Sequence, residues 1–218
     1  DRASALYNGS SGNVTIWNST IANNHSTNGY VILNWNTLKI RNSTLSGNTS
    51  ATVDFGPALF NSGILLIESS TFANKGHNPS IRNVDGYVTI QDTIFVAEPG
   101  NQNCAGDLSP TYWTSLGYNI YNDASCPATG TGDLINTDPL LAMLGDWGGL
   151  TMTLPPQVGS PAVDHRDGVC MVDGFPVNPF VVLFEDQRHE PRDDGDCDTG
   201  AFEGSVVLLK TYLPLALR

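Results

Sequence analysis

One eight-residue pattern recurs four times in the first hundred residues, and it constrains the fold more than any other feature. The four copies read VTIWNSTI, LKIRNSTL, LLIESSTF and VTIQDTIF. Aligned on Ile16, Ile40, Ile67 and Ile90, they follow one another at spacings of 24, 27 and 23 residues. Such periods are typical of solenoids, because a single repeat buries its apolar face only by stacking on its neighbours.

The apolar positions around each isoleucine predict three short strands per repeat. Aliphatic residues stand two positions before it, large apolar residues five positions after it, and a third apolar residue eight to ten positions before it: Val14, Leu38, Leu65 and Val88; Ile21, Leu45, Phe72 and Phe95; Leu6, Ile32, Leu59 and Ile81. These segments are rich in β-branched residues and poor in Ala, Glu and Lys, which favours strands over helices. The sequence therefore predicts an all-β chain built as a three-sheet parallel β-helix, nearly without helix.

Small polar residues follow each isoleucine, where the pattern indicates a bend. Their positions are Asn18, Asn42, Ser69 and Asp92, followed directly by Ser19, Ser43, Ser70 and Thr93. Such residues tolerate unusual backbone angles, and stacked copies bond to one another in ladders. The alternative is an outward binding strip, but Thr15, Lys39, Leu66 and Thr89 beside the aliphatic pairs share no chemistry. The structural interpretation is therefore favoured.

The four cysteines, Cys104, Cys126, Cys170 and Cys197, form no CxxC pair, so disulfides are a better interpretation than a metal site. Proximity along the chain favours Cys104–Cys126 and Cys170–Cys197, although four cysteines allow three pairings. Six Asn-x-Ser/Thr sequons are glycosylation candidates and agree with an exported glycoprotein: Asn8, Asn13, Asn18, Asn24, Asn42 and Asn48. We expect an extracellular or cell-surface location.

The charge balance excludes two classes of partner. The chain has 22 acidic and 10 basic side chains, a formal charge of −12, whereas nucleic acids and anionic membranes require a basic face. The segment VVLLKTYLPLAL is apolar over only twelve residues, fewer than the roughly 20 of a membrane helix, so no transmembrane anchor is expected. No signal peptide opens the sequence, which indicates a processed chain or a fragment.

Longer blocks add a family resemblance. The rungs resemble the NSTISGN repeats of bacterial right-handed parallel β-helix surface proteins, of the pectate-lyase-like superfold. The blocks NCAGDLSPTYWTSLGYNIYNDASC, DLINTDPLLAMLGDWGGLTMTLPPQVGSPAVDHRDGVC and DQRHEPRDDGDCDTGAFE are similar to the carboxy-terminal half of choice-of-anchor Q proteins. Trp147, His165 and His189 depart from that pattern. The resemblance implies a right-handed β-helix over residues 1–103, final turns closed by a loop-rich, disulfide-bonded cap over 104–204, and an apolar tail over 205–218. No catalytic activity is established for that family as a whole.

The acidic residues of the chain match no complete catalytic or metal-binding pattern. Glycoside hydrolysis needs two carboxyl groups about 5–10 Å apart, yet no two acids of adjacent repeats share an offset, so no catalytic residue is assigned. Asp194, Asp196 and Asp198 alternate as at the start of a calcium loop, but the EF-hand pattern fails, and Ca²⁺ is the only cofactor suggested. We expect Asp198 and Gly200 to form a tight turn, and Asp186, Arg188 and Arg192 to form ion pairs.

The two ends of the chain suggest assembly. Leu6 already fills an inward position with no polar cap before it, and an uncovered solenoid end is a template for another strand. The tail places apolar residues after the predicted cap: Val207, Leu208, Leu209, Tyr212, Leu213 and Leu215. The sequence therefore predicts a self-assembling, non-enzymatic structural protein that forms a head-to-tail filament or surface layer. The alternatives are a fragment of an adhesin, or a carbohydrate-binding or lyase-type β-helix, since Trp17 and Trp35 are suited to contact cell-surface polysaccharide.

Overall fold

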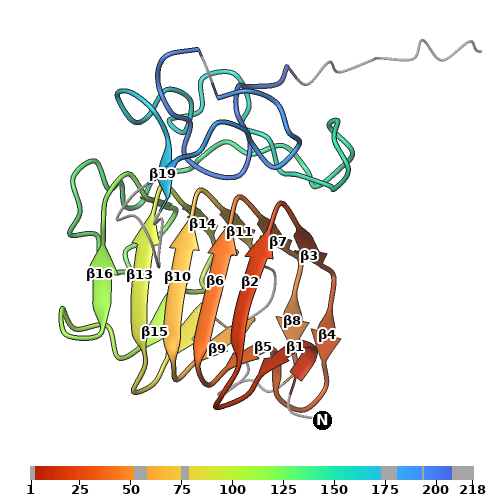
Figure 1. The fold of residues 1–218 in the computed structure, drawn as a ribbon, viewed down its shortest axis with the longest axis vertical. Helices are drawn as coiled ribbons and strands as arrows, with labels where there is room; N and C mark the ends of the chain where they lie inside the picture. The colour runs from red at the N-terminus through yellow and green to blue at the C-terminus, as the bar shows by residue number, and fades with distance from the viewer. Residues whose placement is uncertain (1–2, 52–57, 75–78, 173–180, 193, 208–218) are drawn as a thin grey trace, which may run out of the picture.

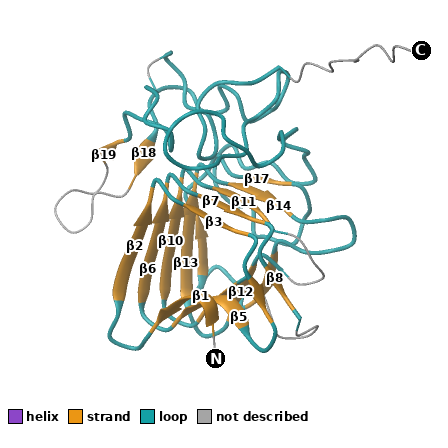
Figure 2. Ribbon diagram, turned by 90° about the vertical axis from the view of Figure 1, so that its right-hand side faces the viewer, coloured by secondary structure: helices purple, strands orange, loops and turns teal. Residues whose placement is uncertain are grey.

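A computed structural model describes residues 3–51, 58–74, 79–172, 181–192 and 194–207. Its first half is a parallel β-solenoid, and its second half is a compact set of loops (Figures 1 and 2). No helix occurs in these described ranges. No described segment therefore has the length and apolarity of a membrane-crossing helix.

Three five-stranded parallel sheets form the solenoid. Sheet A contains β1 (Ala3–Asn8), β5 (Tyr30–Asn34), β9 (Leu59–Asn61), β12 (Ile81–Asn83) and β15 (Cys104–Gly106). Sheet B contains β2 (Asn13–Trp17), β6 (Thr37–Arg41), β10 (Ile64–Glu68), β13 (Tyr87–Gln91) and β16 (Trp113–Ser115). Sheet C contains β3 (Thr20–Ala22), β7 (Thr44–Ser46), β11 (Thr71–Ala73), β14 (Ile94–Val96) and β17 (Ile120–Tyr121). One strand from each sheet makes a rung, so that β1, β2 and β3 are rung 1 and β15, β16 and β17 are rung 5.

The predicted alignment of the repeats is the register of sheet B. Ile16 pairs with Ile40, Ile40 with Ile67, and Ile67 with Ile90. Ile40, Ile67 and Ile90 have no exposed surface, and Ile16 packs on the same apolar cluster. The predicted column of stacked aliphatic residues is thus confirmed, and it forms the core of the solenoid.

A ladder of asparagines, not predicted from the sequence, stacks inside the corner between sheets A and B. The Nδ2–Oδ1 distances from Asn8 to Asn34, Asn34 to Asn61 and Asn61 to Asn83 are 2.7, 2.7 and 2.8 Å. All four side chains are buried, so each amide satisfies the next. The ladder fixes the corner at the same point in four successive rungs.

Two short pairs complete the strands. β4 (His25–Ser26) pairs in parallel with β8 (Thr49–Ser50), and β18 (Met171–Val172) pairs in antiparallel with β19 (Val181–Val182). Both predicted disulfides are present, Cys104–Cys126 and Cys170–Cys197. The first covers the rung-5 end of the core, because Cys126 packs there against the apolar cluster. The second lies in the small apolar cluster formed with Val172 and Leu183.

The predicted loop-rich, disulfide-bonded region that follows the rungs is present, and a large part of it lies along the solenoid. We call the described residues from 135 onward the flanking module, and Figure 1 shows it above the carboxyl ends of the sheet B strands, along the side of the solenoid. It contacts Thr20 in rung 1 and Tyr118 in rung 5. The segment that contains Cys126 and Ala128 covers the rung-5 end of the core. Leu134 covers it as well, because it bridges to Ile120. The module is a lateral support, because it bonds to the polar bend residues and also packs Leu141 and Ala162 against Ile94 and Ile120.

Candidate functional site

The bend between sheets B and C is the surface that the flanking module recognises. Asn18, Asn42, Ser69 and Asp92 have φ values of 49°, 49°, 45° and 47°, in the left-handed region. The residue after each forms the predicted ladder, in which the Ser19 and Ser43 amides donate to the Oγ atoms of Ser43 and Ser70 at 3.1 and 3.2 Å. Asn, Asp and Ser are common where such angles are required, which explains their recurrence. The ladder prediction is confirmed.

Threonines one position further on bond directly to the module. Gln187 Nε2 donates to Thr20 Oγ1 at 3.0 Å, and Thr44 Oγ1 donates to Gln187 Oε1 at 2.6 Å. In rung 3, Thr71 Oγ1 accepts the Ala201 amide at 3.1 Å. A Cβ on Gly200, whose φ is 107°, would lie 2.8 Å from Thr71 Oγ1, so only glycine permits this approach. Successive rungs therefore present one polar row to one partner surface.

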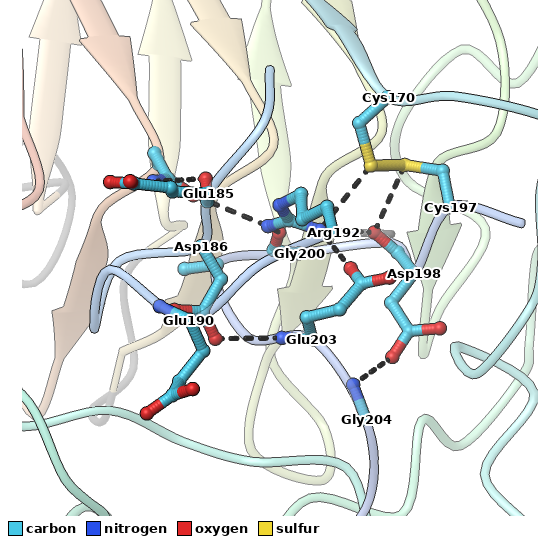
Figure 3. A network of polar contacts seen from close by, with 12 residues as sticks. Cys170, Glu185, Asp186, Glu190, Arg192, Cys197, Asp198, Gly200, Glu203 and Gly204 are labelled. Carbon is cyan, nitrogen blue, oxygen red and sulfur yellow. Dashed lines mark hydrogen bonds and ion pairs between the residues drawn. A yellow bond between two sulfur atoms is a disulfide. The ribbon is translucent and has the colours of Figure 1, made fainter. Parts of the chain in front are cut away.

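Arg192 is the centre of the contact (Figure 3). Its Nη1 pairs with Glu203 and donates to the Asp198 carbonyl, and its Nη2 donates to Gly200 O at 2.8 Å and to Asn42 Oδ1 at 3.2 Å. The side chain is almost wholly buried. An arginine without these partners would leave a charge in a dry interface, which is costly. Arg192 therefore joins the module to rung 2.

The predicted group of ion pairs is present in a different arrangement. Arg188 pairs with Asp186 at 2.6 Å, as expected. Arg192, however, pairs with Glu203 and not with Asp186, a partner that the sequence reasoning missed. Asp186 Oδ2 also accepts the Glu203 amide at 3.0 Å, so the two pairs are connected through one short segment.

Burial raises the pKa of three carboxyl groups at this interface. Asp92 Oδ2 pairs with Arg166 at 2.6 Å, yet loss of solvent raises the pKa of Asp92 to about 6. The same cause raises the pKa of Asp198 to about 6 and that of Glu203 to about 8. Nearby arginines oppose each of these shifts. One oxygen each of Asp92 and Glu203 is buried without a hydrogen-bond partner, which agrees with easy protonation.

The three aspartates of the calcium hypothesis do not converge on one point. Asp198 is buried and accepts the backbone amides of Asp164 and Gly204, as predicted for a turn carboxylate. Asp194 and Asp196 are exposed, and Asp196 Oδ1 accepts the Gly168 amide at 2.8 Å. Among the described residues, no group of three or more His, Cys, Asp or Glu side chains is arranged to hold a metal ion. The geometry therefore gives the calcium hypothesis no support.

Three of the six glycosylation candidates are buried in the fold. The side chains of Asn8, Asn42 and Asn48 are buried, and each Nδ2 donates inside the molecule: to Asn34 and Thr37, to Asn18 and Glu185, and to Ile21 and Asn74. Glycosylation would have to replace one of these hydrogens and fit a sugar into a packed site. The fold therefore disfavours a glycan at these three positions. Asn13 is exposed and Asn18 and Asn24 are partly exposed, so they remain candidates.

The residues predicted for assembly lie partly in rung 1. Leu6, Val14, Ile16 and Ile21 point into the core but remain partly exposed, whereas Ile32, Leu38, Ile40 and Leu45 of rung 2 are at most 1% exposed. Val206 bridges to Gln157 and Val207 is 68% exposed. Leu208, Leu209, Tyr212, Leu213 and Leu215 lie outside the described residues.

Two grooves border the module. One, of about 420 Å³, lies between Trp17 and the segment around Phe184. The other, of about 480 Å³, is lined by Asn74, Glu98, Asn122 and Asp138 among others.

No family model matches the sequence, and neither the curated proteins nor the solved structures include a match. The chemistry of the chain itself must therefore carry any functional conclusion.

Proposed function

We propose that the chain is a non-catalytic structural protein of an extracellular surface, and that it self-associates head to tail through rung 1. The observation that carries the proposal is the partial exposure of rung 1. Each inward aliphatic side chain of rung 1 is more exposed than the side chain that occupies the same position in rung 2. In the described residues, strands β1, β2 and β3 each pair with a neighbour on one side only. Such an edge gains free energy when another strand covers it.

The occupant in this proposal is the apolar carboxy-terminal segment of a second copy. Val206 already adopts a bridging conformation beside Gln157, and the sequence that follows is rich in leucine and valine. Adding a strand to an exposed edge is a common mode of recognition. Because the two contacting surfaces differ, repeated contacts extend into a fibre unless the rotation closes a ring. Two disulfides are consistent with an oxidising, extracellular location.

Electron microscopy and light scattering of the concentrated protein test the proposal. We expect fibres or layers from the full chain, and their loss on deletion of residues 208–218 or on introduction of a lysine at Thr15, an exposed position of edge strand β2. Thr89→Lys is the matched control, because Thr89 belongs to the same outward row of sheet B in an interior strand. Uniform monomers of the unmodified chain at high concentration would overturn the proposal.

A further inference from the structure

The groove between rung 1 and the flanking module has features that the assembly proposal does not use. Its lining includes Trp17, Asn18 and Asn42 from the solenoid, and Val182, Phe184 and Glu185 from the module. Its volume of about 420 Å³ lies in the range of about 300–1,000 Å³ typical of small-molecule sites. The solenoid supplies one wall and the module supplies the other.

Both walls carry aromatic rings that remain open to solvent. Trp17 is 45% exposed and Phe184 is 73% exposed. The Arg41 guanidinium lies over the indole of Trp17, 5.8 Å from the ring centroid, and pairs with Glu68 at 2.7 Å. Glu68 has no exposed surface. A buried ion pair thus supports an exposed ring, which lowers the entropic cost of using that ring to bind a ligand.

Asn42 connects the two walls, because its side-chain amide bonds to Asn18 on the solenoid and to Glu185 on the module. Its Nδ2 donates to Asn18 Oδ1 at 2.7 Å and to the Glu185 carbonyl at 3.1 Å, while its Oδ1 accepts from Arg192. The amide of Asn42 is thereby satisfied within the protein. The Asn18 NH₂ group, a donor, and the Glu185 carboxylate, an acceptor, are then the groups suited to a ligand. Glu185 is 56% exposed and bonds to His189 at 2.9 Å.

Aromatic walls with a few placed donors and acceptors match the chemistry of a sugar. A pyranose ring has an apolar C–H face that packs on an aromatic ring, and hydroxyl groups at its edge that bond to amides and carboxylates. Charge narrows the class further, since the chain carries −12 overall and Glu185 borders the groove. We propose that this groove binds a neutral glycan, with sugar rings packed against both Trp17 and Phe184 and hydroxyls bonded to Asn18 and Glu185.

Titration calorimetry and tryptophan fluorescence with cellohexaose, maltohexaose and oligogalacturonate test this proposal, on protein produced without N-glycosylation so that Asn18 is bare. We expect binding of at least one neutral hexasaccharide and weaker or no binding of the acidic one. Trp17→Ala and Phe184→Ala should each reduce affinity at least tenfold, and Glu185→Gln by a smaller factor. Trp35→Ala is the matched control, because Trp35 is 41% exposed on another face, where it contacts Phe60.

Several results would overturn the proposal. These are the absence of neutral-glycan binding at millimolar concentration, preference for oligogalacturonate, or an equal loss of affinity in Trp35→Ala. Phe184→Ala keeps the test informative if Trp17→Ala disturbs rung 1, because Phe184 is largely exposed. Circular dichroism and sedimentation of each variant separate a loss of binding from a loss of fold or assembly. Glycan binding by a strictly monomeric chain would leave this proposal intact and remove only the assembly proposal.

Discussion

The solenoid and the flanking module reach a defined structure in opposite ways. In the solenoid the inward residues of each rung stack on chemically similar residues of the next, and these contacts are spread over fifteen strands in three sheets. In the module, β18 and β19 are the regular strands among the described residues, and individual contacts of Arg192, Arg188 and Gln187 hold the loops. The stabilising contacts of the solenoid are therefore distributed over many residues, whereas those of the module are concentrated in a few side chains. The two regions should therefore respond differently to single substitutions.

Arg192→Leu should have the largest effect, because it should destabilise the module while leaving the solenoid folded. Removing the arginine deprives Glu203, Asn42 and the carbonyls of Asp198 and Gly200 of a buried donor, at an expected total cost of about 3–5 kcal/mol. Hydrogen exchange should show lost protection in the module, with protection retained in β5, β6, β10 and β13. The double variant with Glu203→Leu should recover part of the loss. Equal loss of protection in both regions would show that the regions unfold as one.

Truncation in the apolar column tests how far the solenoid distributes its stability. Ile67→Ala, at a position with no exposed surface, should lower the free energy of unfolding by about 2–5 kcal/mol. Ile16→Ala should cost less, because Ile16 in rung 1 is partly exposed. Chemical denaturation of both variants measures the difference. Equal costs would mean that rung 1 is as well covered in solution as the interior rungs.

The dependence of stability on pH belongs to the interface. Asp92, Asp198 and Glu203 have raised pKa values in the folded state, so each favours the fold when protonated. Their contribution is complete below the unfolded pKa, near 4, and is lost as the pH rises through about 6 for the aspartates and about 8 for Glu203. We expect the thermal midpoint to be higher at pH 5 than at pH 8.

Asp92→Asn should reduce the fall in the free energy of unfolding between pH 4 and pH 6 by roughly 1–3 kcal/mol. Asp85→Asn provides the control, because Asp85 is exposed and lies outside the interface. Calorimetric melting in a pH series distinguishes the two variants. An unchanged slope in Asp92→Asn would assign the dependence to other carboxyl groups.

The smallest expected effect concerns the ladder at the bend. Ser43 Oγ accepts the Ser19 amide and donates to Arg41 O at 2.7 Å, so Ser43→Ala should cost about 1 kcal/mol. Ser10→Ala, at an exposed position in a turn, is the control and should be nearly neutral. Urea denaturation is sensitive enough for this comparison. A large effect of Ser43→Ala would place the bend among the few critical contacts.

Periodicity explains which features the sequence predicted. The register of Ile16, Ile40, Ile67 and Ile90 follows from a regular spacing, and both disulfides follow from proximity along the chain. The asparagine ladder also had a signal, since each of its residues stands two positions after an inward aliphatic residue. Burial of the Asn42 amide could be inferred only once the module was placed against the bend.

The location of the module had no comparable signal. Arg192 meets Asn42 across 150 positions of sequence, and no repeated pattern connects them. The contact depends on how aperiodic loops fold back, which single residues and not spacing determine. The pairing of Arg192 with Glu203 was missed for the same reason, because seven acidic residues lie nearer to Arg192 in the sequence.

The module bonds to Thr20 in rung 1 and to Tyr118 in rung 5, and this has a mechanical consequence. A bare stack of rungs under tension would peel from one end, one turn at a time. Here rungs 1 and 5 both bond to the flanking module, so a pulling force is shared between them before either rung can detach. Under a force that separates rung 1 from rung 5, the solenoid should therefore resist the loss of single turns and yield in one larger event when the contacts with the module break.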